Sequence, residues 1–245
     1  ESAGEVREAQ VFTVPMAAPD DVSGVAELFD AGTVDPAHVV ALIAQTEGDG
    51  YARGFAAQCL QLLLAERLGL SRDAVFARIP MLMIGGTAGL MCPHVTLFVN
   101  RPGVPDAADG APRLALGVAS TRALLPEEYG TPRQVALVAE AVRAAMADAG
   151  LAGADDVVCV EMKCPQMTEA RMQDALGRGA GVVHPSPAAA SSLSRGASAL
   201  GAAVALGEVP AEAITQAAIA GRPELFTTRG SASSGSEQVA VRVVV

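Results

Sequence analysis

The chain has 245 residues, of which 51% are hydrophobic and only 3% aromatic, and its formal net charge is −10. This length supports one large or two ordinary domains, with a core of small aliphatic side chains. The acidic balance argues against a nucleic-acid or anionic-membrane partner, because binding phosphates requires a basic surface. No apolar stretch approaches a membrane span and no signal peptide opens the chain, so a cytoplasmic location is expected.

The first half of the chain alternates apolar strands with helices. The predicted strands cover residues 11–14, 39–43, 81–84 and 95–99, and the predicted helices cover about 22–30, 55–68 and a segment that starts at the cap Ser71. A stretch rich in Pro, Gly and Asp follows at residues 101–112. It predicts a domain boundary, with a first domain at 1–105 and a second at 106–245.

The second half repeats this order. Its predicted strands cover 114–118, the run around Lys163 and 239–245, and its predicted helices cover about 133–149, 194–206 and 211–220. Ser and Gly residues at 231–236 predict a tight loop before the last strand. The repetition indicates a tandem α+β fold, in which each unit is a sheet with helices on one face.

Lys163 is the only lysine among seventeen basic residues, and it lies within the apolar run 157–165. A guanidinium keeps its proton in a protein, whereas a desolvated ammonium can release one and act as a base. Buried, perturbed lysines concentrate at active sites, so Lys163 is a candidate catalytic base. The alternative is an incidental lysine whose stem lies along a strand end. The four cysteines and three histidines show no metal-ligand spacing, and give no argument for a zinc site.

The two halves align at three places. Gln45 falls on Lys163, residues 51–56 fall on 193–198, and residues 84–87 fall on 233–236. Each half therefore offers a strand-end residue, an Arg-Gly pair entering a helix, and a small-residue loop. Backbone N–H groups of such a loop can approach an oxygen closely, as an oxyanion hole requires.

At these residues the chain resembles the cyanuric acid hydrolase and barbiturase family, the ring-opening amidohydrolases. The resemblance covers nearly the whole chain and rests on the strings at 163–165, 194–201, 124–128, 147–150, 46–50 and 85–87. It implies three similar domains around a pseudo-threefold axis, the "Toblerone" fold, with one Ser–Lys pair per domain facing a central site. It also implies hydrolytic opening of a cyclic amide without a metal or cofactor.

The resemblance assigns the chemistry to the second unit. Lys163 matches the catalytic base and Ser233 the nucleophile, which a neutral amine activates by accepting its proton. Ser231, Ser234 and Ser236 stay open as alternative nucleophiles. The matched substrate-binding positions are Arg53, Arg195, Gly85, Gly86 and Ser234.

Two departures from the family pattern bear on the substrate. Gln45 stands where the family has lysine and Ile84 where it has serine, which favours a less symmetric substrate than cyanuric acid, with a carbon substituent near Ile84. The chain also stops at Val245, about two-thirds of the family length. We therefore expect a third-domain chain, either a separate or a cleaved polypeptide, and a higher oligomer.

These features predict a subunit of a ring-opening amidohydrolase-like enzyme that acts on a small cyclic amide or imide. An acyl transferase or cyclase using the same Ser–Lys acyl-enzyme, and a non-catalytic ligand-binding scaffold, are the alternatives. Lys163 favours the enzymatic interpretations, because a remnant would have no reason to keep one lysine.

Overall fold

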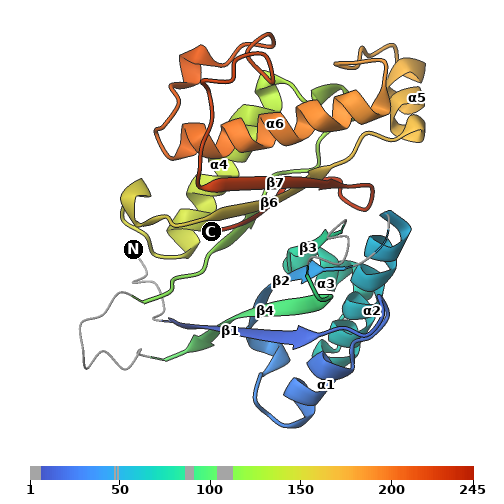
Figure 1. The fold of residues 1–245 in the computed structure, drawn as a ribbon, viewed down its shortest axis with the longest axis vertical. Coiled ribbons are helices and arrows are strands. Elements are labelled where there is room, and N and C mark those ends of the chain that lie inside the picture. The colour runs from blue at the N-terminus through green and yellow to red at the C-terminus, as the bar shows by residue number, and fades with distance from the viewer. Residues whose placement is uncertain (1–6, 47, 49, 86–90, 104–112) are drawn as a thin grey trace. The chain divides into compact units, whose positions relative to one another are not determined.

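The computed structural model describes residues 7–46, 48, 50–85, 91–103 and 113–245. Its contacts divide the chain into two compact units, Glu1–Leu116 and Gly117–Val245. Each unit contains a four-stranded mixed sheet and its own helices (Figure 1). No helix in the described ranges is long and apolar enough to cross a membrane.

The first unit has the strand order β1-β4-β2-β3. Its elements are β1 (Arg7–Pro15), α1 (Ser23–Asp30), β2 (Val39–Gln45), α2 (Gly50–Leu68), α3 (Arg72–Arg78), β3 (Met81–Ile84) and β4 (His94–Pro102). All the strands and helices predicted for this half are confirmed, several with longer ends. Ser71 caps α3 as predicted, since its Oγ accepts a hydrogen bond from the Ala74 backbone N–H at 3.1 Å.

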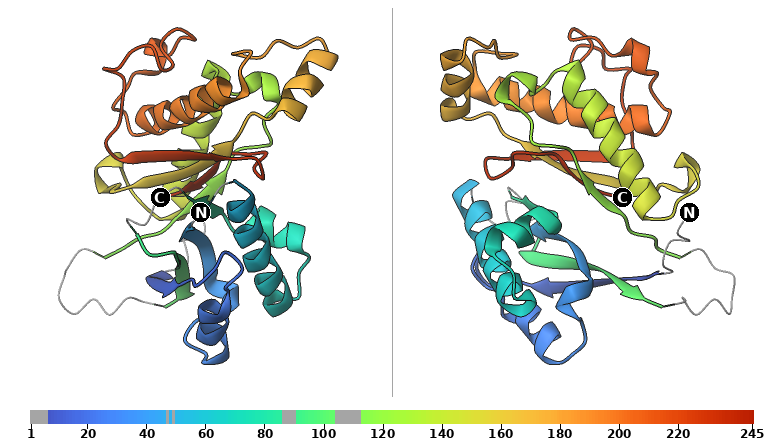
Figure 2. Two further views of the ribbon diagram at one scale, coloured as in Figure 1. Left: turned by 45° about the vertical axis from the view of Figure 1, so that its right-hand side comes forward. Right: turned by 180° about the vertical axis from the view of Figure 1, so that it is seen from behind.

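The second unit has the strand order β5-β8-β6-β7. Its elements are β5 (Val118–Ser120), α4 (Pro132–Asp148), β6 (Val160–Pro165), α5 (Glu169–Gly177), α6 (Pro187–Ala205), β7 (Gly230–Gly235) and β8 (Arg242–Val244). The long helices α4 and α6 cover one face of this sheet (Figure 2). Valine and methionine side chains of β6 and β8 join the residues of α4 in one apolar core.

The two sheets share one topology. In the first unit β2 runs parallel to β3 and antiparallel to β4, which in turn pairs antiparallel with β1. In the second unit β6, β7, β8 and β5 repeat these relations in the same order. The repetition seen in the sequence is therefore a repetition of structure.

Two predictions around the sheet of the second unit are wrong. The strand predicted at 114–118 begins only at Val118. Just before it, Gly117 pairs with Val245 through the backbone and packs so tightly on α4 that an added Cβ would collide with the carbonyl oxygen of Ala145. The segment predicted as a loop at 231–236 is largely the strand β7. Ser and Gly favour strands weakly, but pairing along the whole length of β6 supplies the backbone partners that stabilise β7.

The helices of the second unit also differ from prediction. The helix predicted at 211–220 is a single 3-10 turn, Ala211–Ala213, followed by irregular turns that include Ala220 at a φ of +58°. Helix α6 begins seven residues earlier than predicted, at Pro187, because Ser186 caps it and proline suits its first position. Helix α5 was not predicted, although Thr168 caps it.

Candidate active site

Lys163 and Ser233 lie directly opposite each other on the parallel strands β6 and β7. Residues paired in this way place their side chains on the same face of a sheet. Lys163 is 1% exposed, so its amine is removed from bulk water. The Ser233 hydroxyl is buried too and has no hydrogen-bond partner among the residues that the structure describes. The structure thus brings together the two residues predicted to form the catalytic pair.

Arg242 extends this pair into a polar row that crosses the whole sheet. On β8 it lies opposite Lys163, and on its other side it lies opposite Ser120 of β5. Its Nη1 donates a hydrogen bond to Ser120 Oγ at 3.0 Å. Burial lowers the pKa of Arg242 from its ordinary value, yet a guanidinium keeps its proton in a protein. A second cation therefore lies beside Lys163.

The sequence analysis missed Arg242, although a signal was present. It is the only charged residue in the run 239–245, between Val241 and Val243, which are both fully buried in the core. Alternation along a strand then points Arg242 to the face opposite the core. Arg242, like Lys163, is a basic residue within an apolar strand, and this shared feature of the sequence marks it as a candidate site residue.

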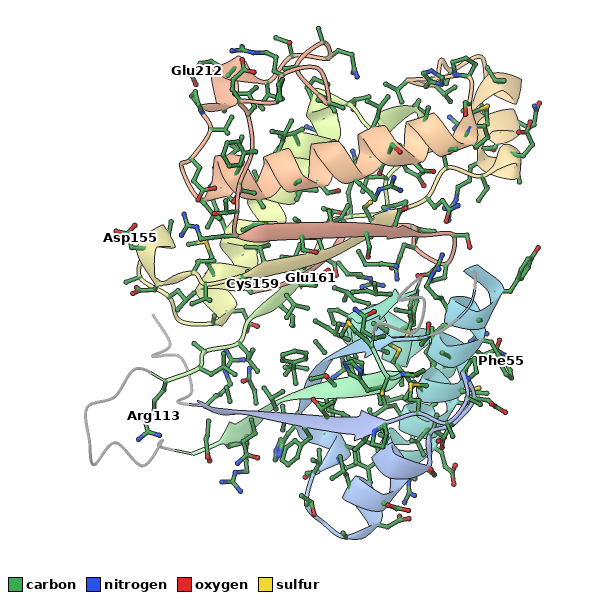
Figure 3. All side chains as sticks on the ribbon, viewed as in Figure 1. Phe55, Arg113, Asp155, Cys159, Glu161 and Glu212 are labelled. Carbon is green, nitrogen blue, oxygen red and sulfur yellow. The ribbon has the colours of Figure 1, made fainter. Side chains whose placement is uncertain are left out.

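Glu161 adds a carboxylate to the same face of β6, two residues before Lys163. It lies on the side of the sheet away from α6 (Figure 3). Burial raises the pKa of Glu161, while a hydrogen bond from Ser231 and the charge of Lys163 act in the opposite direction. Burial thus works against the ionised form of Glu161, and the two partners work in favour of it.

The register distinguishes among the four candidate serines. Ser231 forms a hydrogen bond with the Glu161 carboxylate, and Ser234 accepts a hydrogen bond from Arg195 Nη1 at 3.1 Å. Ser236 follows the end of β7 and is exposed. Only Ser233 is paired with Lys163.

Arg195 approaches β7 from the helix layer. It belongs to α6, and besides Ser234 it binds Ser192 Oγ through Nη2 at 2.8 Å. Because neighbouring residues of a strand point to opposite faces, Ser234 and Ser233 present their side chains to different sides of β7. Arg195 is thus joined to the residue next to Ser233 and not to Ser233 itself.

Cys164 does not compete as a nucleophile. It is fully buried on the helix side of β6, next to Ser194 and Ser198. Burial raises the pKa of its thiol. The reactive form of cysteine is the thiolate, so this residue is kept in its unreactive form.

In the first unit the corresponding positions hold different chemistry. Gln45 on β2 is paired with Ile84 on β3 and with His94 on β4, as Lys163 is paired with Ser233 and Arg242. The sequence alignment of Gln45 and Ile84 with the catalytic pair thus agrees with the register of the sheet. His94 is a further residue that the alignment did not include.

Arg53 repeats the placement of Arg195. An added Cβ at Gly85 would lie 2.7 Å from Arg53 Nη1, so glycine leaves the room that this guanidinium occupies. Gly85 stands at the position of Ser234 in the second unit. Gly86, the other predicted backbone position, lies outside the described residues.

A cavity of about 470 Å³ lies between the end of β1 and α1. None of the predicted site residues that the structure describes lines it, and its Asp21 side chain is already bound by the backbone N–H groups of Ala17 and Ser23. We therefore place the candidate site at the polar row and not at this cavity.

Comparison with known proteins confirms the resemblance to the ring-opening amidohydrolases. A family model described as amidohydrolase ring-opening protein matches residues 10–245. The chain belongs to this family. A cyclic amide hydrolase from Azorhizobium caulinodans is 44% identical over 239 residues, 96% of this chain and 65% of that protein. A cyanuric acid amidohydrolase from Enterobacter cloacae is 42% identical over 247 residues, 97% of this chain and 66% of that protein.

Solved structures of the family share the fold. A cyanuric acid hydrolase described as an evolutionary innovation by structural concatenation matches with a TM-score of 0.91 at 38% identity, over 98% of this chain and 67% of that one. The cyanuric acid hydrolase from A. caulinodans matches with a TM-score of 0.90 at 41% identity, over 98% of this chain and 66% of that one. The chain spans about two thirds of the length of the family members that it matches.

Proposed function

We propose that this protein opens the ring of a cyclic amide or imide by hydrolysis, with Ser233 as nucleophile and Lys163 as general base. The observation that carries the proposal is the cross-strand register, which pairs a buried amine with a buried hydroxyl on one face of the sheet. Membership of the ring-opening amidohydrolases supports the substrate class.

In the proposed reaction the neutral amine of Lys163 accepts the Ser233 proton while Oγ attacks a ring carbonyl. The ring C–N bond then breaks, and the proton passes from Lys163 to the leaving nitrogen. Water, deprotonated by Lys163, attacks the resulting ester and releases the opened product. Lys163 passes the proton taken from water to the departing Ser233 Oγ, so the complete cycle returns both residues to their starting forms.

The charges around the pair support this chemistry. A tetrahedral intermediate carries an oxyanion, which nearby cations and N–H donors stabilise most strongly in a site that excludes water. Arg242 is a buried cation in the row beside Lys163. As a like charge it also favours the neutral form of the Lys163 amine, which is the form that can act as a base. We assign carbonyl binding to Arg195 and Arg53.

The first unit is proposed to bind substrate without attacking it. Gln45 offers a neutral amide and Ile84 an aliphatic surface where the second unit has its amine and hydroxyl. Such a pair suits a ring that carries carbon at one position, as a barbiturate does, better than a ring with three equivalent sides. The backbone at Gly85 and Gly86 and the Ser234 position complete the proposed binding set.

A third unit of the same topology is proposed for the functional protein. About one third of the length of these relatives lies outside the part matched here. The threefold arrangement and the participation of a further chain remain predictions.

The proposal is tested by incubating the protein with cyanuric acid and with barbituric acid and measuring ring opening. An acylating probe followed by peptide mapping of residues 227–245 should place the adduct on Ser233. A label on Ser231 or Ser236 would assign the nucleophile differently. Product formation only in the presence of an amine would indicate acyl transfer. Binding of both rings without turnover or labelling would indicate a scaffold.

A further inference from the structure

A buried carboxamide connects the two helices of the second unit with the strand that carries Lys163. Gln134, in the first turn of α4, is 0% exposed. Its Oε1 accepts a hydrogen bond from the Gly130 backbone N–H at 2.7 Å. Its Nε2 donates to three acceptors on α6, namely Ser194 O and Ser194 Oγ at 3.0 Å and Ser198 Oγ at 2.9 Å. Every polar atom of this carboxamide is therefore engaged.

The bonds continue from α6 to the exit of β6. Ser194 Oγ donates to the carbonyl of Pro165 at 3.1 Å, and Pro165 ends β6 two residues after Lys163. One turn earlier on α6, Ser191 Oγ accepts from the Met167 N–H at 3.0 Å. The backbone just beyond Lys163 is thus hydrogen-bonded to α6 at Pro165 and at Met167. Gln134 donates to Ser194 Oγ, which leaves the hydroxyl proton of Ser194 directed at the Pro165 carbonyl.

The same helix carries Arg195, which binds Ser234 on β7. Since Ser194 and Arg195 are neighbours, α6 holds the ends of both β6 and β7. The relative placement of Lys163 and Ser233 therefore depends on how α6 is fixed, and Gln134 is the side chain that ties α6 to α4 at this level.

The first unit provides an internal comparison. In the alignment of α2 with α6, Ala52 and Ala56 stand where Ser194 and Ser198 stand, and Ala56 is fully buried in an apolar core. Alanine side chains cannot make these hydrogen bonds, yet the first unit has the same sheet topology. It also lacks the amine and the hydroxyl, with Gln45 and Ile84 in their place. The polar connection accompanies the catalytic pair and is not required by the fold.

We propose that Gln134 is a positioning residue, which acts through Ser194 to hold the exit of β6 so that Lys163 stays opposite Ser233. The proposal rests on the proposed function for its catalytic consequence. Its structural part, the restraint on residues 163–167, can be measured without any substrate.

The experiment compares three variants with the unchanged protein. Gln134→Met removes the carboxamide at similar length. The triple variant Gln134→Met, Ser194→Ala, Ser198→Ala replaces all three connected side chains by apolar ones. It removes the two serine hydroxyls that Gln134→Met leaves without the carboxamide, although the Gly130 N–H and the Pro165 carbonyl still lose their side-chain partners. Gln216→Met is the matched control, because Gln216 Nε2 binds the carbonyl of the same Gly130 at 2.9 Å but reaches none of the α6 serines through the bonds described.

Amide hydrogen exchange of residues 163–167 is expected to accelerate at least about tenfold in the Gln134→Met and triple variants, since local restraints set the opening of a segment. kcat on the substrate of the unchanged protein should fall by about tenfold or more, because small misplacements of reacting groups are costly. The triple variant should regain part of the melting temperature that Gln134→Met loses, because two buried hydroxyls are removed with the carboxamide, but it should not regain kcat. Gln216→Met should change neither exchange nor kcat.

Two results would overturn the inference. One is unchanged exchange at residues 163–167 in both variants. The other is a triple variant that regains kcat together with its melting temperature, which would make Gln134 merely a packing residue. If the unchanged protein opens no ring, the proposed function fails, while the exchange measurement still decides whether Gln134 restrains the strand.

Discussion

Lys163 and Arg242 are neighbouring basic residues on one face of a small sheet. Like charges directly opposite each other on paired strands destabilise a sheet. A neutral amine at Lys163 removes this repulsion, and a neutral amine is also what a general base requires. Arg242 thus favours the form of Lys163 that the proposed reaction requires, whereas a carboxylate at Glu161 would favour the charged form.

Replacement of Lys163 by arginine keeps a positive charge at this position but removes the ability to accept a proton. Lys163→Arg is expected to lower kcat by about 100-fold or more, because arginine keeps the positive charge but does not act as a base. Steady-state kinetics measure this effect, and circular dichroism checks that the fold is retained. Arg143→Lys, at an exposed position of α4, is the converse control and should leave kcat unchanged. A Lys163→Arg variant that keeps more than about a tenth of kcat would exclude Lys163 as the base.

At the scale of elements, close packing joins the entry of β5 to α4. Gly117 exchanges both of its backbone hydrogen bonds with Val245, at 2.9 and 3.0 Å, while its Cα lies against the last turns of α4. The glycine thereby lets a helix and a sheet edge approach more closely than any side chain would allow.

Gly117→Ala should therefore force α4 away from the sheet. We expect the free energy of unfolding to fall by about 1–3 kcal/mol, because overpacking against backbone cannot be relieved by a rotamer change. Denaturant titration measures this loss. Gly177→Ala in α5, where an added Cβ meets nothing within 4 Å, is the matched control. It should be neutral or stabilising, since alanine favours a helix more than glycine does. Equal effects of the two substitutions would contradict the packing argument.

A bidentate ion pair joins α5 to the 3-10 turn before α4. Arg178 Nη1 and Nη2 donate to the two oxygens of Glu127 at 2.7 and 2.8 Å. This contact lowers the pKa of Glu127 to about 2. A carboxyl with a lowered folded-state pKa stabilises the fold above its ordinary pKa of 4.5, and this contribution disappears as the pH falls toward 2.

Glu127→Gln is accordingly expected to be less stable than the unchanged protein above pH 4.5 and equally stable near pH 2. Urea titrations across this range measure the difference in unfolding free energy. Arg178→Met should remove most of the same pH dependence, since Arg178 is the main cause of the shift. A difference between the unchanged protein and Glu127→Gln that stays constant with pH would show that the ion pair does not couple to folding.

At the scale of the whole molecule, one topology is used twice with different chemistry. The second unit has the amine, the hydroxyl and the second cation, and the first unit has Gln45, Ile84 and His94 at the matching positions. Repeated units conserve their packing faces while their polar positions vary independently. A repeat can therefore keep its place in a protein after its catalytic residues are replaced.

If the functional protein contains a third unit, its native mass per active site should be about one and a half times that of the 245-residue chain. Native mass spectrometry of the purified protein measures this ratio, and denaturing mass spectrometry shows whether the extra mass is on the same polypeptide or on another. The 245 residues alone should then turn over substrate poorly. Full activity of the 245 residues in isolation would contradict the expectation.

The sequence by itself determined most elements of the fold. Helical spacing at Val135, Val138 and Val142 and the cap at Ser71 predicted α4 and α3, and the internal alignment predicted that the two units correspond. Lys163 was conspicuous as the only lysine, and the strings around it indicated the family. These features are local in the chain, or depend on comparing one stretch with another, so they can be read without knowing which strands pair.

Only the tertiary structure decided how the residues of the site meet. Long-range register placed Ser233, and not Ser231 or Ser234, opposite Lys163, and made a strand of a segment whose residues favour a loop. The same register brought Arg242 beside Lys163, and helix packing brought Gln134 to Ser194 across sixty positions of the chain. A shift of one residue in strand pairing turns every side chain to the other face, and residue preferences alone do not specify that shift.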